Sequence, residues 1–431
     1  MRAPPFVSRC VRRTARPPAV AGGRGCDDAA VPSAGELPIT QYVPDGATID
    51  LAWGHPGEAL LPVQEWAAAT EAALTRYGWQ ALSYGHGAGP GPLVDWLAAR
   101  LGRIDGRAPA PAELFVTAGA SHALELTCAA LTRPGDVVVV DSPTYHLALR
   151  VIADHGVRLV GAPADDEGID PAGTAALLDR LRSDGLRVPL LYLVPTYANP
   201  TGGCLPADRR AALVELAART GTALVEDDTY RELAYPPAVA PPSLWSLADP
   251  AADPAPVVRL GSFAKSVAPG LRLGFLTGSP ALVRALADRG MVDSGGGVNH
   301  TTALAMAAFG ASGGYDRHLA RVRVGYRARR DALAGALRAQ LPAVRFRLPD
   351  GGWFLWLRLP DDVPAGPLAG AAGRHGVGFL PGARCYLAGG GSHRARLSYS
   401  LFDPTQLVDA AGRLAAAVAE LSSPGRSAPA R

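Results

Sequence analysis

Short apolar runs alternate with amphipathic stretches through the middle of the chain. Several runs are continuous rather than alternating, which is typical of strands that are buried on both faces. Between them, the stretch 207–219 has helical spacing, follows Pro206 and ends before Gly221, as a helix with defined ends would. This order predicts a mostly parallel sheet with helices on both faces. The apolar runs are 114–116, 137–140, 190–194, 223–225, 257–258 and 273–276.

The carboxyl third of the chain has a different pattern. A long helical pattern rich in Arg and Ala covers 316–341, a closing helical pattern covers 404–421, and strand-like pieces lie between them at 353–359 and 396–400. We therefore predict a smaller α+β domain, which also takes up a segment near the amino end. The predicted division is a disordered tail at 1–35, a first segment of the small domain at 36–75, the large domain at 76–315, the rest of the small domain at 316–424 and a tail at 425–431.

The composition is that of an ordinary globular protein, with 48% hydrophobic and 19% charged residues among 431. A net charge of +3 does not indicate a nucleic-acid surface, and no apolar stretch reaches the ~18 residues of a membrane span. We therefore expect neither a nucleic acid nor a membrane as partner. The five cysteines are scattered without C-x-x-C spacing, which favours a cytoplasmic protein with reduced thiols and no metal. For residues 1–35 the alternatives are a disordered tail, a start assigned too early and a transit peptide.

Polar and aromatic side chains follow five of the apolar runs. In open α/β sheets, ligands bind at the carboxyl ends of the strands, so we expect these side chains to meet. They supply a small Gly/Ser loop, an aromatic ring, an amide, carboxylates with a tyrosine, and a lysine, a set that fits an anionic aromatic aldehyde better than a nucleotide. The glycine-rich run 85–91 follows no strand and lacks G-x-G-x-x-G spacing, so it does not indicate a dinucleotide loop. The five segments are 117–121, 141–145, 195–202, 226–230 and 261–265.

Three motifs occur in a fixed order along these strand ends, and together they are far more specific than any one alone. They are Asn199-Pro200-Thr201-Gly202, Asp227-Asp228-Thr229-Tyr230, and Ser262-Phe263-Ala264-Lys265 followed by Pro269-Gly270-Leu271-Arg272-Leu273-Gly274. On these motifs the chain resembles the class I/II aminotransferases of fold type I, in the subgroup of 2-aminoadipate and kynurenine aminotransferases, from about Gly54 to about Ser400. The resemblance implies a large domain with a mostly parallel seven-stranded sheet sandwiched by helices, a smaller α+β domain, and pyridoxal 5'-phosphate (PLP) as cofactor.

The resemblance implies a role for each residue around the cofactor ring. Lys265, the only lysine among the strand-end residues, would carry PLP as a Schiff base, because that bond needs a reachable neutral amine. Asp227 would pair with the pyridinium nitrogen, with its neighbour Asp228 as the competing candidate. Hydrogen bonds to the phenolic oxygen of the ring and stacking on the ring face would come from the residues Tyr230, Asn199 and Tyr145. Lys265, Asp227 and Tyr145 are the predicted catalytic residues.

The phosphate group of PLP needs hydrogen-bond donors. Ala120 and Ser121 open a predicted helix, whose first N–H groups bind anions, and Ser262 and Arg272 add a hydroxyl and a guanidinium. In the family a tyrosine of the neighbouring subunit also reaches the phosphate, and Tyr84 matches it. The resemblance therefore implies a homodimer with shared active sites.

Substrate recognition is assigned to Arg396, which matches the arginine that binds the α-carboxylate in the family. Arg394 lies two residues away and faces the same side of a regular strand, so the choice between them depends on the resemblance. Asn199 and Gly54 complete the predicted substrate-binding residues. Four residues near the expected cleft have open roles, either functional or structural: His55, His86, Asn299 and His300, the last two after the glycine-rich segment 294–297.

The predicted function is transfer of an amino group between an α-amino acid and a 2-oxo acid. The alternative keeps PLP but leads to decarboxylation, lyase or oxidase chemistry in specialised-metabolite biosynthesis. A transcription regulator carrying such a domain behind a winged-helix DNA reader would need roughly 70 further residues, whereas about 35 low-complexity residues precede the resemblance.

Overall fold

The computed structural model describes residues 39–41, 46–249, 251–252 and 256–422. The described residues from 46 onward belong to one compact unit. Because this unit is not divided further, the domain boundaries at 75–76 and 315–316 stay a prediction. The tails expected at 1–35 and 425–431, together with Cys10 and Cys26, lie outside the described residues.

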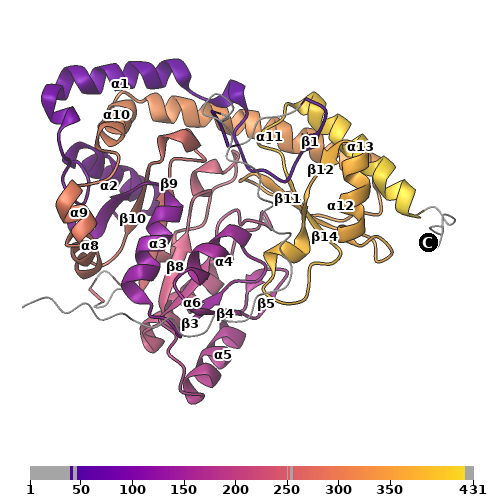
Figure 1. Ribbon diagram of the computed structural model, residues 1–431, viewed down its shortest axis with the longest axis horizontal. Coiled ribbons are helices and arrows are strands. Elements are labelled where there is room, and N and C mark those ends of the chain that lie inside the picture. Colours follow the sequence, from indigo (N-terminus) through magenta and orange to yellow (C-terminus); the bar gives the residue numbers. More distant parts are fainter. Residues whose placement is uncertain (1–38, 42–45, 250, 253–255, 423–431) are drawn as a thin grey trace, which may run out of the picture. The chain divides into compact units, whose positions relative to one another are not determined.

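A seven-stranded sheet forms the centre of the fold, in the order β2-β10-β9-β8-β7-β3-β4 (Figure 1). β10 runs antiparallel to both neighbours and the other pairs are parallel, so the predicted mostly parallel sheet is confirmed. The edge strand β4 was not predicted, because its side chains are only half-buried or exposed and its sequence lacks a buried apolar run. The strands are β2 (Leu114–Thr117), β3 (Val137–Val140), β4 (Arg158–Gly161), β7 (Leu190–Leu193), β8 (Ala223–Asp227), β9 (Val257–Ser262) and β10 (Gly274–Thr277).

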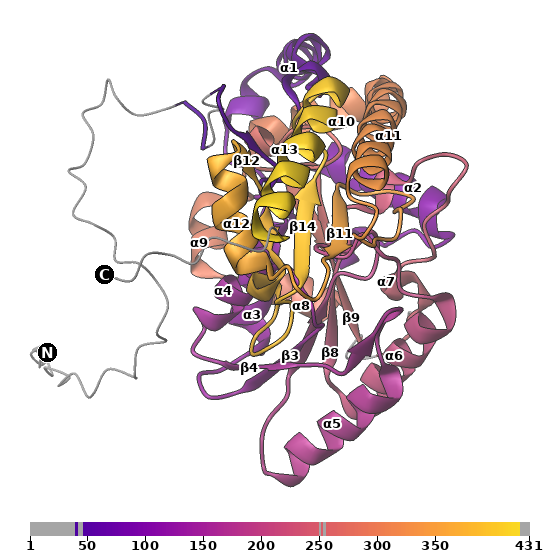
Figure 2. The ribbon, with the colours of Figure 1, turned by 90° about the vertical axis from the view of Figure 1, so that its right-hand side faces the viewer.

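Helices cover both faces of this sheet (Figures 1 and 2). In β3, Val138 and Val140 pack with α3, α4 and α8, whereas Val137 and Val139 pack with α5, α6 and α7. Successive side chains of a strand point to opposite faces, so a continuous valine run serves both layers. These helices are α3 (Ala120–Leu131), α4 (His146–Ala153), α5 (Pro171–Ser183), α6 (Ala207–Thr220), α7 (Leu244–Leu247) and α8 (Pro280–Ala287).

The carboxyl third contains a second, three-stranded sheet in the order β11-β14-β13. The strand predicted at 396–400 starts two residues earlier, at Arg394, and the helix predicted at 316–341 spans Gly314–Gln340. Near the amino end, Ile49 of β1 pairs in parallel with Val377 of β12. The remaining elements are β1 (Ile49–Asp50), α1 (Val63–Tyr77), α2 (Gly91–Asp105), β5 (Ala164–Asp165), β6 (Gly168–Ile169), α9 (Gly290–Gly295), α10 (His300–Ala311), α11 (Gly314–Gln340), β11 (Phe354–Arg358), α12 (Ala365–Arg374), β12 (Val377–Gly378), β13 (Leu380–Pro381), β14 (Arg394–Ser398) and α13 (Pro404–Ser422).

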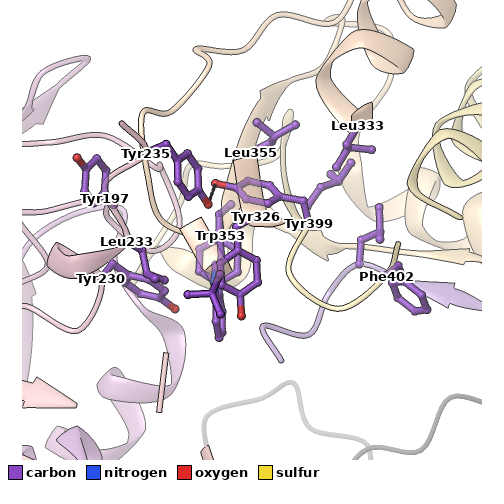
Figure 3. Packing of buried hydrophobic residues seen from close by; sticks show 14 of the residues in the cluster. Tyr197, Tyr230, Leu233, Tyr235, Tyr326, Leu333, Trp353, Leu355, Tyr399 and Phe402 are labelled. Carbon is purple, nitrogen blue, oxygen red and sulfur yellow. Dashed lines mark hydrogen bonds between the residues drawn. The ribbon is translucent and has the colours of Figure 1, made fainter. Parts of the chain in front are cut away.

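A cluster of buried aromatic rings connects the end of β8, helix α11 and the three-stranded sheet (Figure 3). The Trp353 ring meets Tyr230 edge-on at 5.9 Å and Tyr326 at 5.4 Å between ring centres. The Tyr235 hydroxyl donates a hydrogen bond to the Gly352 carbonyl, and the Tyr399 hydroxyl donates to Gly351 at 3.1 Å. Edge-to-face pairs add about 0.5–1.5 kcal/mol each beyond burial, so this cluster fixes the position of Trp353 and Tyr230.

Candidate active site

Lys265 follows the carboxyl end of β9 and is half-buried. Its ammonium nitrogen lies 4.8 Å from the Trp353 ring centre and 5.9 Å from that of Tyr230. Burial lowers the pKa of Lys265 to about 8; the charge of Asp227 opposes this shift, and those of Arg396 and Arg272 add to it. A nucleophilic amine with a neutral form near pH 8 is therefore available here.

The sequence contains a further signal for this residue that motif reasoning missed. Lys265 is the only lysine in the chain, and every other basic residue among its 42 lysines and arginines is arginine. Counting lysines would have singled it out without any motif.

Asp227 is the last residue of β8 and is buried. Its Oδ2 accepts a hydrogen bond of 2.7 Å from the Tyr192 hydroxyl, and its Oδ1 is buried with no hydrogen-bond partner among the described residues. Burial raises the pKa of Asp227, while Tyr192 and Thr229 oppose the shift and Asp228 adds to it. A buried carboxylate oxygen without a partner fits an N–H group of a bound ligand.

Asp228 points to the opposite side of β8, because neighbouring side chains of a strand alternate. Its carboxylate forms buried ion pairs with Arg231 and, at 2.8 Å, with Arg259. Glu226 faces the same side and accepts hydrogen bonds from the backbone of α7. Since the Oδ2 of Asp228 is held by two arginines, the geometry favours Asp227 as the ring partner.

Tyr192 is a site residue that sequence reasoning missed. It lies inside β7 rather than after it, and its ring is fully buried, so its position looks like ordinary core. Only the pairing of β7 with β8, which sets Tyr192 opposite Val225, brings its hydroxyl to Asp227.

Arg396 and Asn199, both assigned to the site from sequence, meet in the structure. The buried Arg396 donates from Nη1 to Asn199 Oδ1 at 2.7 Å and from Nη2 to the Ala52 carbonyl at 2.5 Å. Its Nε is buried without a partner among the described residues. Gly54 packs beside it: the guanidinium lies 4.3 Å from the Phe354 ring centre, and a Cβ on Gly54 would come within 3.1 Å of that ring.

Tyr145 and Tyr230 lie in the same electrostatic environment. Tyr145 is half-buried at the start of α4, and burial raises its pKa, with Asp227 adding to the shift and Arg396 opposing it. Tyr230 is fully buried, and burial, Tyr145 and Asp227 raise its pKa as well. Both tyrosine hydroxyls are therefore close enough to Asp227 and Arg396, the charged residues around Lys265, for these charges to shift their pKa values.

A cradle for an anion lies at the start of α3. Gly119 precedes the helix with φ 91°, and a Cβ there would lie 3.0 Å from Arg272 Nη2. Arg272 Nη2 donates to the Ala118 carbonyl at 2.9 Å. Ala120 and Ser121 are the first residues of α3, where backbone N–H groups have no partner within the helix. The sheet register brings Ser262 opposite Gly274, which itself contacts Gly119.

The glycine-rich segment before α10 is needed for close packing of two backbones. Gly297 pairs with Gly85, and a Cβ on Gly296 would lie 2.3 Å from the Gly85 carbonyl oxygen. His300 donates from Nε2 to the Gln80 carbonyl at 3.0 Å, and the Asn299 amide donates to the Arg272 carbonyl. Asn299 and His300 thus hold neighbouring backbone in place, next to the anion cradle.

Tyr84, His86 and His55 are also expected near the site, and the structure places each of them differently. Tyr84 is 83% exposed and does not join the residues around Lys265. His86 accepts a hydrogen bond from the Ala88 amide at 3.3 Å. His55 lies near the site, since burial and the charge of Lys265 lower its pKa.

The arrangement fits PLP. It offers one amine, one buried acceptor in Asp227 Oδ1 for the protonated ring nitrogen, and backbone, hydroxyl and guanidinium donors for a phosphate. Among the described residues no group of three or more His, Cys, Asp or Glu could hold a metal ion. In the same part of the chain, no helix is both long and apolar enough to cross a membrane.

Comparisons with known proteins agree with this geometry. Residues 48–414 match the family described as aminotransferase class I and II. A 2-aminoadipate transaminase from Thermus thermophilus is 33% identical over 377 residues, which cover 86% of this chain and 90% of that one. A kynurenine aminotransferase from Pyrococcus horikoshii, solved with PMP, superposes with a TM-score of 0.80 at 30% identity, over 88% and 92% of the two chains.

A third comparison bears on the cofactor. The alpha-aminoadipate aminotransferase from Thermus thermophilus, solved with N-(5'-phosphopyridoxyl)-L-leucine, superposes with a TM-score of 0.76 at 32% identity, over 87% of this chain and 93% of that one. The expected fold type I architecture, PLP as cofactor and amino-group transfer are confirmed, and the alternative PLP chemistries are not favoured. The chain belongs to the class I and II aminotransferase family.

Proposed function

We propose that Lys265, Asp227 and Arg396 divide the work of amino transfer between an α-amino acid and a 2-oxo acid. The observation that carries this proposal is the amine of Lys265, whose pKa burial lowers to about 8 within range of both Asp227 and Arg396. Bound PLP supplies an electron sink for the bonds at the substrate Cα. Lys265 Nζ binds the cofactor and moves the proton at Cα.

The other residues hold charges in place. Asp227 Oδ1 would accept a hydrogen bond from the protonated ring nitrogen, while the Tyr192 hydroxyl donates to its second oxygen. Arg396 binds the α-carboxylate, and its hydrogen bond to Asn199 orients the guanidinium plane. Tyr145 would stack on the ring, Tyr230 and Asn199 would donate hydrogen bonds to its phenolic oxygen, and Gly54 would leave room beside Arg396.

We further propose that the phosphate is bound by the start of α3 and by Ser262 and Arg272. The donors are of three kinds: the backbone N–H groups of Ala120 and Ser121, the hydroxyl of Ser262 and the fork of Arg272. Together they match the three acceptor oxygens and the charge of a phosphate.

A homodimer with shared sites is part of the proposal. Trp79, Leu82 and Tyr84 expose 76%, 75% and 83% of their surface, and Trp79 and Tyr84 line a cavity of about 340 Å³ with His300 and Leu304. Large exposed apolar side chains that are grouped in this way are typical of protein interfaces. In the dimer, Tyr84 would reach the phosphate of the partner subunit.

The cytoplasm is the proposed location. Cys128, Cys204 and Cys385 are free thiols, as a reducing compartment allows.

The reaction is tested by following the absorbance of the bound cofactor. Adding 2-aminoadipate or kynurenine to the PLP-loaded protein should convert the aldehyde form to the amine form, and 2-oxoglutarate should reverse the change. Lys265→Ala should abolish the cycle because it removes the only lysine. Release of carbon dioxide, with the aldehyde form kept through repeated turnovers in the absence of a 2-oxo acid, would instead identify a decarboxylase.

Exchanging the two adjacent acids separates their roles. Asp227→Asn should leave PLP bound but slow the exchange of the substrate Cα proton by several orders of magnitude, because an amide does not keep the ring nitrogen protonated. Asp228→Asn should mainly lower the free energy of unfolding, by about 3–5 kcal/mol, because it removes the buried carboxylate that Arg231 and Arg259 share and leaves Asp105 to balance most of their charge. Deuterium exchange at Cα and urea unfolding measure the two effects, and the reverse pattern would reassign the ring partner to Asp228.

The carboxylate contact is tested with Arg396→Lys. The substitution keeps the positive charge but removes the planar guanidinium. We therefore expect kcat/KM for the amino acid to fall by an amount equivalent to about 2–5 kcal/mol of transition-state stabilisation. Reaction with the corresponding amine, which lacks the carboxylate, should hardly change, and neither should PLP affinity. An equal loss for amino acid and amine would show that Arg396 supports the site and does not read the carboxylate.

The shared site is tested by mixing subunits. Tyr84→Phe and Lys265→Ala proteins, each impaired, should regain partial activity when refolded together, because one site of the mixed dimer combines an intact Lys265 with an intact Tyr84. Separately tagged chains allow the mixed dimer to be isolated. If it forms but stays inactive, each site is built within one subunit.

A further inference from the structure

Three arginines lie directly opposite one another at one end of the three-stranded sheet. Arg358 of β11 pairs with Arg394 of β14, and on its other side it pairs with Arg345 in an antiparallel bridge closed by backbone hydrogen bonds of 3.0 and 2.7 Å. Cross-strand neighbours of this kind have Cβ atoms about 4.5–5.5 Å apart, and like charges in such pairs are destabilising. The fold therefore concentrates positive charge here at an energetic cost.

These arginines line one cavity of about 640 Å³. This volume is in the range of small-molecule sites, about 300–1,000 Å³. Neither Lys265 nor Asp227 lines the cavity, so it is separate from the cofactor site. Its cationic and aromatic lining residues are Arg345, Arg347, Arg358, Arg394, Phe346, Trp356 and Tyr386.

The positive charge of the cavity is not balanced by the described residues around it. The structure records no hydrogen bond or ion pair from the side chains of Arg345, Arg347 and Arg394 to any other described residue. Arg358 has only Asp361, at 3.9 Å, and both side chains are well exposed. An exposed pair at that distance contributes little.

Carboxylates on the opposite wall offset only part of this positive charge. The hairpin of β5 and β6 brings three acids to the cavity, but Arg209 binds Asp165 at 2.6 Å and Glu167 at 3.3 Å. Asp166 is the third acid of that hairpin, and burial raises the pKa of Asp141, which also lines the cavity, to about 7. Arg209 supplies one positive charge against the three carboxylates of the hairpin, so the four guanidinium groups of the cavity still outnumber the carboxylates that remain to balance them.

We propose that this arginine cavity is a second ligand site, which binds a small organic anion with a flat apolar body, such as an aryl phosphate or aryl carboxylate. The guanidinium forks match the planar or tetrahedral anion, and the half-buried rings of Phe346, Trp356 and Tyr386 offer faces for the apolar part. Binding an anion relieves the repulsion between the opposed arginines.

The arginine cavity adjoins the active site through two elements. Arg394 and Arg396 lie two residues apart on the same face of β14, and Trp356 is the cross-strand partner of Arg396. Thr201 and Gly203, from the loop that carries Asn199, also line the cavity. A ligand there contacts the far side of the loop that orients Arg396.

Calorimetric titration of the PLP-loaded protein with 1-naphthyl phosphate tests the proposal. One molecule should bind per chain, inorganic phosphate should bind at least about tenfold more weakly, and 1-naphthol should not bind measurably. Arg394→Gln, Arg358→Gln and Arg347→Gln should each weaken binding at least about tenfold, since each removes a charge-assisted contact. Arg219→Gln, which removes the same charge from an exposed site in α6, should leave binding unchanged.

Two controls make the outcome decisive. Thermal unfolding without ligand should show no loss of stability for Arg358→Gln, because the change relieves repulsion. Arg396→Lys should leave binding of 1-naphthyl phosphate intact. The proposal is overturned if the natural chain does not bind the probe, if the three cavity variants bind it as well as Arg219→Gln does, or if Arg396→Lys abolishes binding and so places the probe in the active site. Equal affinity for inorganic phosphate would show that the aromatic side chains do not bind the apolar part of the ligand, and would overturn that part of the proposal.

Discussion

Asp227 is buried at the end of β8 between two further acids, Glu226 and Asp228, and three carboxylates on one face of the strand would repel one another. Strand alternation sends Glu226 and Asp228 to the opposite face, where both are buried. Burying a carboxylate without a partner costs several kcal/mol of desolvation free energy. The attraction of a buried ion pair offsets this cost only when its geometry is good and further hydrogen bonds satisfy both ions. Asp227 can therefore face the cofactor only because arginines on the other side of β8 balance the charges of Glu226 and Asp228.

Those cations are arginines from three separate elements. Arg259 of β9 binds Asp228 and also Asp105 at 2.6 Å, Arg231 binds Asp228, and Arg210 of α6 lies 3.8 Å from Glu226. The acids Glu226 and Asp228 and the three arginines are almost fully buried. None of these arginines pairs with Asp227: its Oδ2 accepts a hydrogen bond from Tyr192, and its Oδ1 has no hydrogen-bond partner among the described residues and stays available to a ligand.

Much of this could be predicted from sequence, because the buried strands have continuous apolar runs and each delivers its polar residues at one edge of the sheet. What escaped prediction has physical reasons. β4 lies at the sheet edge and is half exposed, and Tyr192 looks like core until the register of β7 and β8 is known. Alternation could not separate Arg394 from Arg396, because both face the same side; burial and the contact with Asn199 distinguish them only in three dimensions. A glycine-rich segment is compatible with mobility as well as with close packing, and only the position of Gly85 against the glycines before α10 distinguishes the two.

The solitary lysine also makes the site unusually easy to observe. Apart from the α-amino group, Lys265 Nζ is the only primary amine that the sequence encodes. Protein grown with isotope-labelled lysine would give one side-chain resonance per subunit, and that resonance would need no assignment by mutagenesis. Its chemical shift would follow the charge on the amine as the pH passes through about 8, which makes the free apoenzyme a spectroscopic reporter of its own active site.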